Sequence, residues 1–256
     1  MTKAYRHTGY GRSVRSYDHP NLFNFRDLGG YRGRDGRTVR WRRLFRSDSL
    51  SRIDPADAAS FTALGVRTVI DLRRPREVAR DGRVPEFAGL TYHHLHPEHA
   101  EWEDATDNDE PSDARWLANR YLDLAYGGAA AMVAAVAVIA EADNAPVVVH
   151  CVAGKDRTGV VAALTLAALG VNERDIAEDY ALTAAATDRF TEHMRRVNPE
   201  MATMPARYLM SPAEAMLLFL GDLHRRHGSV RAYLLESGLS EAHLAALDAH
   251  LLEDPA

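Results

Sequence analysis

The chain has 256 residues, a hydrophobic content of 46% and a formal net charge of −5, values that are ordinary for a globular protein. This length suits one large domain or two small ones. The negative charge argues against the basic surface that general nucleic-acid binding requires. A single cysteine, Cys151, excludes an internal disulfide framework.

No repeat or linker divides the chain, so we expect a single domain over residues 1–256. No stretch has the length of a membrane span or the pattern of a cleaved signal peptide. We therefore expect a cytoplasmic protein without an integral membrane segment, although secretion without a cleaved signal would leave no mark in the sequence.

The N-terminal part contains a polar segment, a turn and a basic segment. Residues 1–20 predict a flexible arm, and Asp35-Gly36 predicts a hairpin turn. Arg26 and Asp27 have two open interpretations, a place near an active site or a surface ion pair. The basic residues 40–48 favour a solvated sheet edge, the alternative being a positive wall that steers phosphorylated substrates.

A helix and a buried strand follow. Asp54-Pro55 begins a predicted helix that ends near Leu64. The β-branched residues of 66–73 predict an interior strand of a sheet covered by helices. Asp71 and Arg73 lie at its C-terminal end, where open α/β sheets bind ligands. We predict that both bind substrate, the alternative being an ion pair at the end of the strand.

Residues 90–113 combine a histidine-rich strand with an acidic loop. Strand alternation places His94 and His96 on one face, but no cysteine or aspartate completes a ligand set, so we predict no metal site. Residues 98–113 lack periodicity and predict a solvated loop. Ser112 is a candidate cap for a helix over 113–126, and a second helix is predicted over 129–142.

The most informative stretch runs from a β-branched strand at 147–149 to an Ala- and Leu-rich helix at 160–169. Cys151 lies between them, where the unpaired N–H groups and the dipole of a helix N-terminus favour an anion and a thiolate. Arg157 lies six residues further on, and its planar guanidinium can hold two phosphate oxygens. The spacing indicates a nucleophile and an oxyanion clamp in one loop, the alternative being a buried structural cysteine.

The string His-Cys-Val-Ala-Gly-Lys-Asp-Arg-Thr-Gly at 150–159 resembles the signature loop of the protein tyrosine phosphatase superfamily. Together with Asn-Phe-Arg-Asp-Leu-Gly-Gly-Tyr at 24–31 and Ile-Asp-Leu-Arg at 70–73, it is more narrowly similar to bacterial tyrosine, dual-specificity and lipid phosphatases, mycobacterial ones among them. The resemblance covers most of the chain. It implies an α/β fold with a central, mostly parallel sheet flanked by helices.

The resemblance also implies hydrolysis of phosphomonoesters through a cysteinyl-phosphate, with no cofactor and no metal. The substrate would be a phosphorylated protein, bearing phosphotyrosine or phosphoserine/threonine, or a phosphoinositide. Cys151 would attack phosphorus and Arg157 would follow the developing charge. The remaining cradle and helix-start residues would contact the substrate or the thiolate: Val152, Ala153, Gly154, Lys155 and Thr158.

The general acid is less well specified by the sequence. Asp156 is the leading candidate by position, and the resembling phosphatases carry an aspartate there too. Lys155 and Arg157 would oppose the raised pKa that an acid needs, so Asp71 and the acidic loop at 98–113 stay candidates. Lys155 also adds a second cation, which suits substrates with more than one phosphate.

The C-terminal part, residues 173–253, predicts an all-helical extension. Asn172 caps a predicted helix over 173–187, another covers 190–199, and Ser211-Pro212-Ala213-Glu214 predicts a capping box for a helix to 226. Two more helices end near 253. The methionines of this part favour core packing, a lid over the site being the alternative: Met194, Met201, Met204 and Met210.

Two other functions use similar features. A rhodanese-like sulfurtransferase also carries a loop cysteine, but the Arg157-Thr158-Gly159 start of the helix argues against it. A phosphate-binding module without turnover is the third hypothesis, and the complete set of signature residues argues against that.

Overall fold

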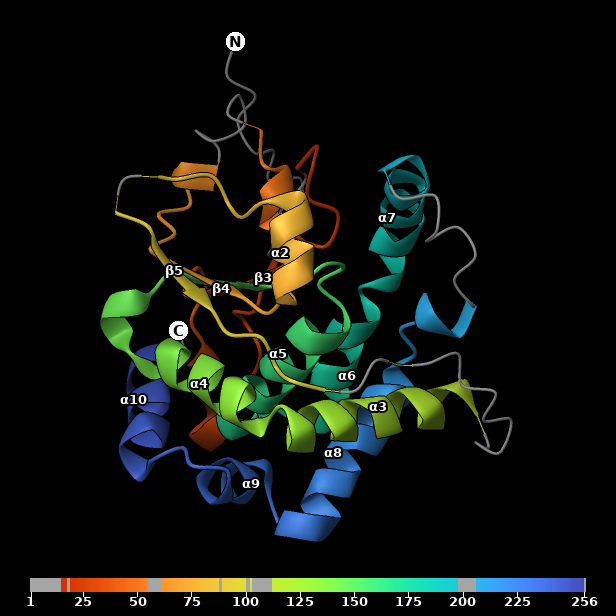
Figure 1. Cartoon of the computed structure of the whole chain (residues 1–256). Coiled ribbons are helices and arrows are strands. Elements are labelled where there is room, and N and C mark those ends of the chain that lie inside the picture. The colour runs from red at the N-terminus through yellow and green to blue at the C-terminus, as the bar shows by residue number, and fades with distance from the viewer. Residues whose placement is uncertain are drawn as a thin grey trace.

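The computed structural model describes residues 15–17, 19–54, 61–87, 89–99, 102, 112–197 and 206–255. Within these ranges a five-stranded sheet has the order β1-β3-β6-β4-β5 (Figure 1). Its strands are β1 (Arg26–Asp27), β3 (Leu44–Ser47), β4 (Thr68–Asp71), β5 (Thr91–His94) and β6 (Val147–His150). β1 pairs antiparallel with β3 and the other neighbours pair in parallel. The predicted α/β fold with a mostly parallel sheet is confirmed, and β6 lies at its centre.

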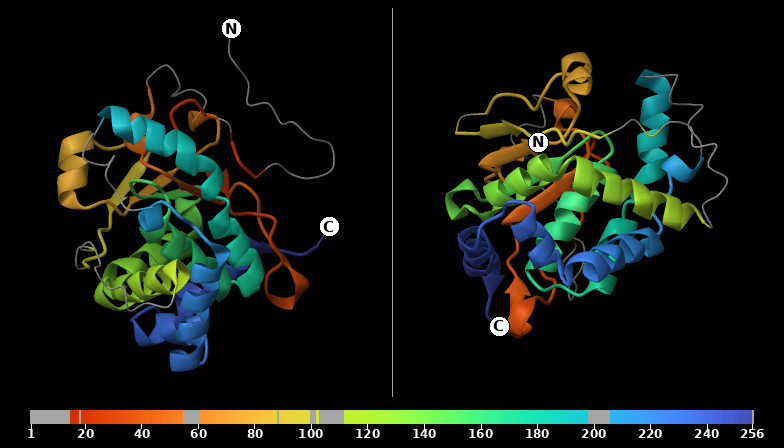
Figure 2. Two further views of the ribbon diagram at one scale, coloured as in Figure 1. Left: turned by 90° about the vertical axis from the view of Figure 1, so that its right-hand side faces the viewer. Right: turned by 60° about the horizontal axis from the view of Figure 1, so that its bottom comes forward.

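Most helices pack on one face of this sheet, below it in Figure 1. They are α3 (Asp113–Gly127), α4 (Ala129–Ala140), α5 (Asp156–Ala168), α6 (Glu173–Ala181), α8 (Ala213–His227), α9 (Val230–Glu236) and α10 (Glu241–Leu251). Two further helices, α2 (Pro75–Asp81) and α7 (Ala184–Val197), stand on either side of the loop that follows β6 (Figures 1 and 2). The short 3-10 turns are η1 (Arg34–Gly36), η2 (Leu50–Arg52), η3 (Ala142–Asn144) and η5 (Ala206–Tyr208).

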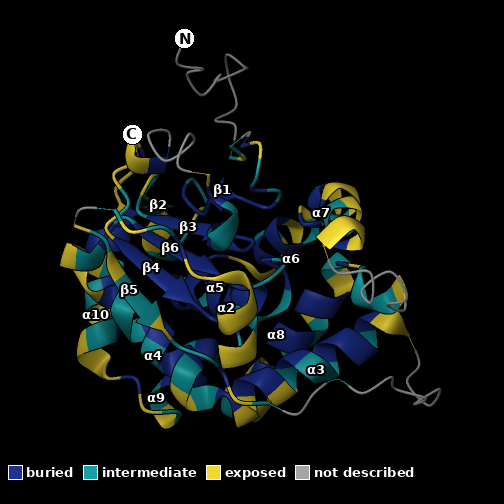
Figure 3. Ribbon diagram, turned by 45° about the horizontal axis from the view of Figure 1, so that its top comes forward, coloured by how far each residue is buried: buried dark blue, intermediate teal, exposed yellow. Residues whose placement is uncertain are grey.

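The central strand is buried on both sides, which explains its unbroken run of valines. Val147 and Val149 pack into the cluster of the helical layer. Val148 points to the opposite face and packs with Phe25 and Phe45. Figure 3 shows β3, β4 and β6 as buried, whereas the edge strand β5 is partly exposed. Each of these buried side chains contributes roughly 1.5–3 kcal/mol of hydrophobic stabilisation, and together they hold the end of β6 in place.

Several predicted helix boundaries differ from the structure. α5 begins at Asp156, four residues before the predicted start, so Arg157 lies in its first turn. The helix predicted over 173–187 ends at Ala181, and α7 begins after a break at 182–183. The predicted capping box at Ser211 is wrong, because α8 begins one residue too late for Ser211 to reach its N–H groups. Ser112 and Asn172 do cap α3 and α6, as predicted.

Both ends of the described chain are tied to the sheet region. Part of the flexible arm predicted over residues 1–20 is held against the sheet region, because Tyr17 N–H donates to Phe25 O at 3.3 Å. Residues 1–14 lie outside the described ranges. The C-terminal part is not entirely helical, since β7 (Leu252–Glu253) pairs antiparallel with β2 (Thr38–Val39). The helix predicted over 54–64 falls mostly outside the described residues.

The C-terminal helices share the main hydrophobic cluster, through residues such as Phe219 and Leu247. Among the described helices no single one is long and apolar enough to cross a membrane. Only α3 and α4 taken together, which meet at 80°, reach that length and hydropathy.

Candidate active site

The loop at 151–155 connects the central strand to the N-terminus of α5 and follows a path that only glycine allows. Gly154 has φ +66°. A Cβ atom there would lie 2.3 Å from the carbonyl oxygen of Ser47 in β3. The loop therefore packs directly on the end of the neighbouring strand, and a side chain at position 154 would push it away.

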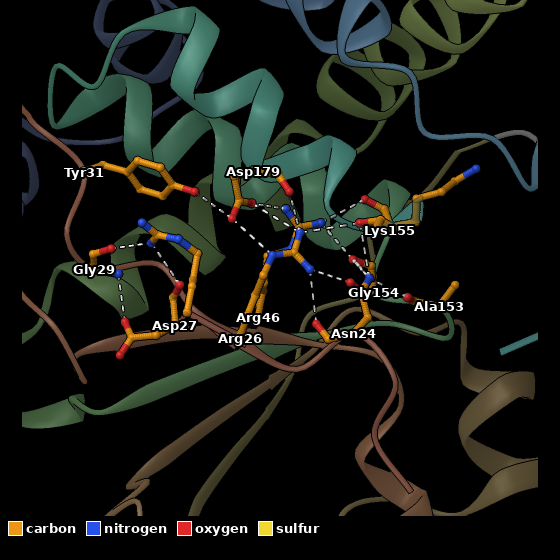
Figure 4. Close-up of polar contacts among 12 residues, drawn as sticks. Asn24, Arg26, Asp27, Gly29, Tyr31, Arg46, Ala153, Gly154, Lys155 and Asp179 are labelled. Carbon is orange, nitrogen blue, oxygen red and sulfur yellow. Dashed lines mark hydrogen bonds and ion pairs between the residues drawn. The ribbon is translucent and has the colours of Figure 1, made fainter. Parts of the chain in front are cut away.

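The carbonyl groups of the loop are bound from behind by two side chains (Figure 4). Arg46 of β3 donates from Nη2 to the carbonyl oxygen of Gly154 at 2.8 Å. Asn24 donates from Nδ2 to the carbonyl oxygens of Ala153 and Gly154, at 3.0 and 3.1 Å. With its carbonyls held on this side, the loop presents its N–H groups on the other.

A buried carboxylate holds the arginines of this rear face. Asp179 of α6 accepts from Arg46 Nη1 at 2.7 Å and from Arg26 Nε at 3.1 Å. These three side chains are at most 2% exposed. Burial acts to raise the pKa of Asp179, but Arg26 and Arg46 lower it to about 2. The carboxylate is therefore charged at neutral pH and neutralises part of the arginine charge beneath the loop.

The front face of the loop carries unpaired amides. Among the described residues, none accepts a hydrogen bond from the backbone N–H groups of residues 152–158. These groups lead into the N-terminus of α5, where the helix dipole adds partial positive charge. A run of free N–H groups at a helix start is the geometry that binds phosphate.

These amides face a cavity of about 680 Å³. Cys151 lines it, although the residue is only 2% exposed. The cavity has two unlike walls: arginines of the α2 region on one side, and apolar residues of α7 on the other. The first wall is Arg74, Arg76 and Arg80; the second includes Ala186, Phe190 and Met194.

Arg157 is held in place at the base of the cationic wall. Its Nη1 and Nη2 atoms donate to the carboxylate of Glu77 in α2, at 2.6 and 3.1 Å, and Nη1 also donates to Leu72 O at 3.2 Å. Burial acts to lower the pKa of Arg157, but the charges of Cys151 and Glu77 raise it above its ordinary value. Arg157 is thus a fixed cation beside the sulfur, and the bidentate contact sets the plane of its guanidinium.

Asp156 and Lys155 also line the cavity, with different partners. Asp156 Oδ1 accepts from the hydroxyl of Tyr121 at 2.8 Å. Lys155 Nζ lies 3.4 Å from the same oxygen and donates to the carbonyl oxygens of Tyr208 and Met210, at 2.5 and 2.9 Å. The ammonium of Lys155 therefore ties the segment after η5 to the loop.

The geometry agrees with the comparison to known proteins. A model of the tyrosine phosphatase family matches residues 17–253. The chain belongs to the tyrosine phosphatase family. It is 32% identical to the triple specificity protein phosphatase PtpB of Mycobacterium tuberculosis, over 87% of this chain and 94% of that protein.

A putative tyrosine-protein phosphatase of Cupriavidus necator is 30% identical, over 94% of this chain and 89% of that protein. The crystal structure of Pseudomonas aeruginosa TpbA aligns with a TM-score of 0.30 and 19% identity, over 68% of this chain and 87% of that one. That last likeness is too weak to carry an argument.

In this phosphatase, Asp71 and Arg73 lie beneath the loop and do not line the cavity. Both are fully buried, and Arg73 Nη2 donates to Asp71 Oδ2 at 2.6 Å. Burial acts to raise the pKa of Asp71, but His150 and Arg73 hold it below its ordinary value. The geometry is that of the strand-end ion pair, so we assign neither substrate binding nor the acid role to Asp71, and no substrate contact to Arg73.

His150 supports the loop from the same side. Its Nδ1 atom donates to the carbonyl oxygen of Cys151 at 3.2 Å, and its Nε2 atom lies 3.6 Å from Asp71. Burial lowers the pKa of His150 to about 4. The ring is therefore neutral at neutral pH and orders the loop through a hydrogen bond.

Other candidates lie away from the reacting groups. Arg26 belongs to the rear network, while Asp27 accepts from the N–H groups of Gly29 and Arg42 and shapes a turn. Burial raises the pKa of Asp27 to about 6. Arg46 is buried, which neither interpretation of the 40–48 segment foresaw.

Several predictions concern residues at the edge of the described chain. Most of the 98–113 loop lies outside it, as do Met201 and Met204. Met194 lines the cavity, whereas Met210 is 43% exposed. Within the described ranges no group of three or more His, Cys, Asp or Glu residues could hold a metal ion.

Proposed function

We propose that this phosphatase hydrolyses phosphomonoesters through a cysteinyl-phosphate, with Cys151 as nucleophile, Arg157 as phosphate ligand and Asp156 as general acid. The observation that carries this proposal is the two-sided loop. Its carbonyls are bound behind, its N–H groups have no acceptor in front among the residues that the structure describes, and the sulfur and guanidinium share the cavity. This arrangement can stabilise the negative charge on the three phosphoryl oxygens while the phosphoryl group is transferred.

The first step transfers the phosphoryl group to the enzyme. The thiolate of Cys151 forms a bond to phosphorus while the bond to the ester oxygen breaks, and Asp156 gives its proton to that leaving oxygen. In the second step a water molecule attacks phosphorus, the S–P bond breaks, and Asp156 takes the proton from water. Inorganic phosphate and the starting thiolate result.

Thr158 suits the departure of sulfur in the second step. It is fully buried, and its hydroxyl has no hydrogen-bond partner in the described part of the chain. A hydroxyl in the first turn of α5 can rotate to donate to a developing thiolate. A buried donor without an acceptor is destabilising, and an acceptor that forms only during the reaction would explain why this one is retained.

The cavity walls support a range of substrates. The apolar wall of α7, with Phe190 and Met194, suits the ring of phosphotyrosine. Because Lys155 is bound to backbone carbonyls, the arginines of α2 take the role of extra cations for substrates with a second phosphate. We propose phosphotyrosine, phosphoserine/threonine and phosphoinositides as substrates, and the name of the mycobacterial relative, triple specificity protein phosphatase, supports a broad range.

The reaction is tested with p-nitrophenyl phosphate in the presence of a metal chelator. We expect turnover by the wild-type protein and its loss in Cys151→Ser. Because Cys151 is the only cysteine, alkylation by iodoacetamide reports on this residue alone and should block turnover in parallel. Equal activity of the Ser variant would refute the mechanism.

The substrate range is tested with a phosphotyrosine peptide, a phosphoserine peptide and a soluble phosphoinositide. Replacing Arg76 and Arg80 together by Gln should lower kcat/KM for a substrate with several phosphates and leave p-nitrophenyl phosphate unaffected. An equal decrease in kcat/KM for both substrates would contradict a role of Arg76 and Arg80 in binding a second phosphate.

The rival functions have direct tests. Transfer of sulfur from thiosulfate to Cys151 would support a sulfurtransferase, for which the free N–H groups of the loop offer no particular use. Tight binding of a phosphopeptide without release of phosphate would support a module that only binds.

A further inference from the structure

Two buried tyrosines stand behind the carboxyl group of Asp156, one from each of two helices that pack against α5. Tyr121 belongs to α3 and Tyr180 to α6. The hydroxyl of Tyr121 donates to Asp156 Oδ1 at 2.8 Å and lies 2.5 Å from the hydroxyl of Tyr180. Tyr121 is fully buried and Tyr180 is 1% exposed. The carboxylate is thus reached from the core by a continuous chain of two hydroxyl groups.

The direction of these two hydrogen bonds follows from the number of hydroxyl protons. Each phenol has one proton, and burial raises the pKa of both Tyr121 and Tyr180 above the ordinary value, so both stay protonated. When Tyr121 donates to Asp156, it accepts from Tyr180. Nothing else in the described ranges accepts a hydrogen bond from Tyr180. The chain therefore runs from Tyr180 through Tyr121 to the carboxylate.

The packing around α5 fixes the positions of the two tyrosine rings. The two rings are nearly perpendicular, at 76°, with centroids 5.8 Å apart. A Cβ atom on Gly159 would lie 3.3 Å from Tyr180 Cδ2, so the glycine lets this ring approach the first turn of α5. Rigid aromatic rings on two packed helices hold a carboxyl group more firmly than a flexible side chain would.

We infer that Tyr121, supported by Tyr180, is a positioning residue for the acid step, donating the hydrogen bond that stabilises the Asp156 carboxylate as its proton leaves. This inference rests on the proposed function, in which Asp156 is the general acid. A donor aimed at a charge that grows during the reaction binds the transition state better than the ground state. The same hydrogen bond holds the carboxylate in place to take a proton from water in the second step.

The other described groups that face Asp156 have separate tasks. Lys155 lies 3.4 Å away but donates to two backbone carbonyls. Arg157 is bound to Glu77 on the far side. Because these cations also lie near the carboxyl group, the effect of Tyr121 must be measured as a difference between variants.

The test compares Tyr121→Phe with the wild type on phenyl phosphate and p-nitrophenyl phosphate, whose leaving groups differ in their need for a proton. Loss of the donor makes Asp156 a weaker acid, so kcat/KM for phenyl phosphate should fall roughly tenfold and that for p-nitrophenyl phosphate much less. The alkaline limb of kcat/KM should move up by about one pH unit, because a donated hydrogen bond favours the ionised form. Tyr180→Phe should shift it the same way by a smaller amount.

The matched control is Tyr233→Phe, which also removes a buried hydroxyl, one that donates to Ala125 O. It should leave both the pH profile and the leaving-group dependence at their wild-type values. If Tyr121→Phe and Tyr180→Phe give the same profile as this control, the inference is overturned.

The failure of the proposed function has a different signature. It fails when the wild type shows no turnover that depends on Cys151. If turnover depends on Cys151 but Asp156→Asn keeps the wild-type alkaline limb, another group is the acid, and the role assigned to Tyr121 falls with it.

Discussion

The loop that follows β6 has two faces of opposite character. Behind it, Asn24 and Arg46 donate to the carbonyl oxygens of Ala153 and Gly154, and Asp179 neutralises part of the arginine charge in a buried network. In front, the N–H groups have no acceptor among the described residues and open on a cavity. The loop thus satisfies its carbonyl acceptors with protein groups and, within the described chain, leaves the N–H groups of residues 152–155 without an acceptor.

This difference teaches how the fold can keep backbone donors without acceptors at the start of a helix. Buried polar groups are costly when unpaired, so free donors persist only where another part of the structure fixes the backbone. The rear network supplies that constraint, and the helix start adds its dipole. Changes on the front face should therefore alter chemistry, and changes on the rear face should alter stability first.

The largest expected effect comes from the front face. Arg157→Lys keeps a charge but loses the planar fork, and we expect kcat to fall by roughly 10²–10³-fold, the cost of removing one donor to a developing oxyanion. Arg120→Lys, at the exposed pair with Asp123 on α3, is the matched control and should have wild-type kcat. A loss of less than about fivefold in Arg157→Lys would contradict the bidentate role.

The rear face should respond in stability. Asp179→Asn leaves two buried arginines without their countercharge, and we expect a loss of about 3–5 kcal/mol in the free energy of unfolding, measured with urea. Asp123→Asn removes an exposed ion pair and should cost less than about 1 kcal/mol. Equal losses in the two variants would show that the network does not hold the loop.

The contact between the loop and β3 is tested by a single methyl group. Gly154→Ala adds both a left-handed backbone penalty and a clash with Ser47, for an expected loss of about 3 kcal/mol together with reduced kcat. Gly228→Ala has a similar φ of +78° but an open surrounding, and should cost only about 1 kcal/mol. Matching losses would mean that the close approach is unimportant.

The smallest expected effect is a pH dependence of stability caused by His150, which supports the loop from beneath. The pKa of His150 is about 4 in the folded protein, against an ordinary value of 6.5. Between these values the unfolded chain binds a proton that the folded chain does not, so stability falls as pH falls through this window. His150→Gln should lose less stability than the wild type between pH 7 and pH 5, by on the order of 1 kcal/mol. Parallel curves of stability against pH for the two proteins would show that His150 binds a proton as readily in the folded state as in the unfolded state.

The front face could be predicted from the sequence because its parts are adjacent in the chain. Cys151, Asp156 and Arg157 lie within seven consecutive residues of a strand–loop–helix unit, and the β-branched strand and Ala-rich helix mark its ends. The central position of β6 follows from the same pattern, since a strand of three valines requires cover on both faces.

The rear face could not be predicted in the same way. Arg46 and Asp179 are separated by 133 residues, and only the order of the sheet brings them together. Arg46 lies in a run of arginines that looks solvated, although alternation in β3 turns it inward. The place of Lys155 in the motif predicts a contact with substrate, but its partners are backbone carbonyls of a distant segment. Such contacts depend on topology, which local spacing does not encode.

The central claim is that Cys151 becomes phosphorylated in a nest of free amides. The most direct measurement is acid quenching within the first turnover of p-nitrophenyl phosphate, followed by mass spectrometry of the peptide that contains residues 151–157. We predict one phosphoryl group on Cys151 of the wild type and none in Cys151→Ser. Steady release of phosphate with an unmodified Cys151, or with the phosphoryl group on another residue, would contradict the account.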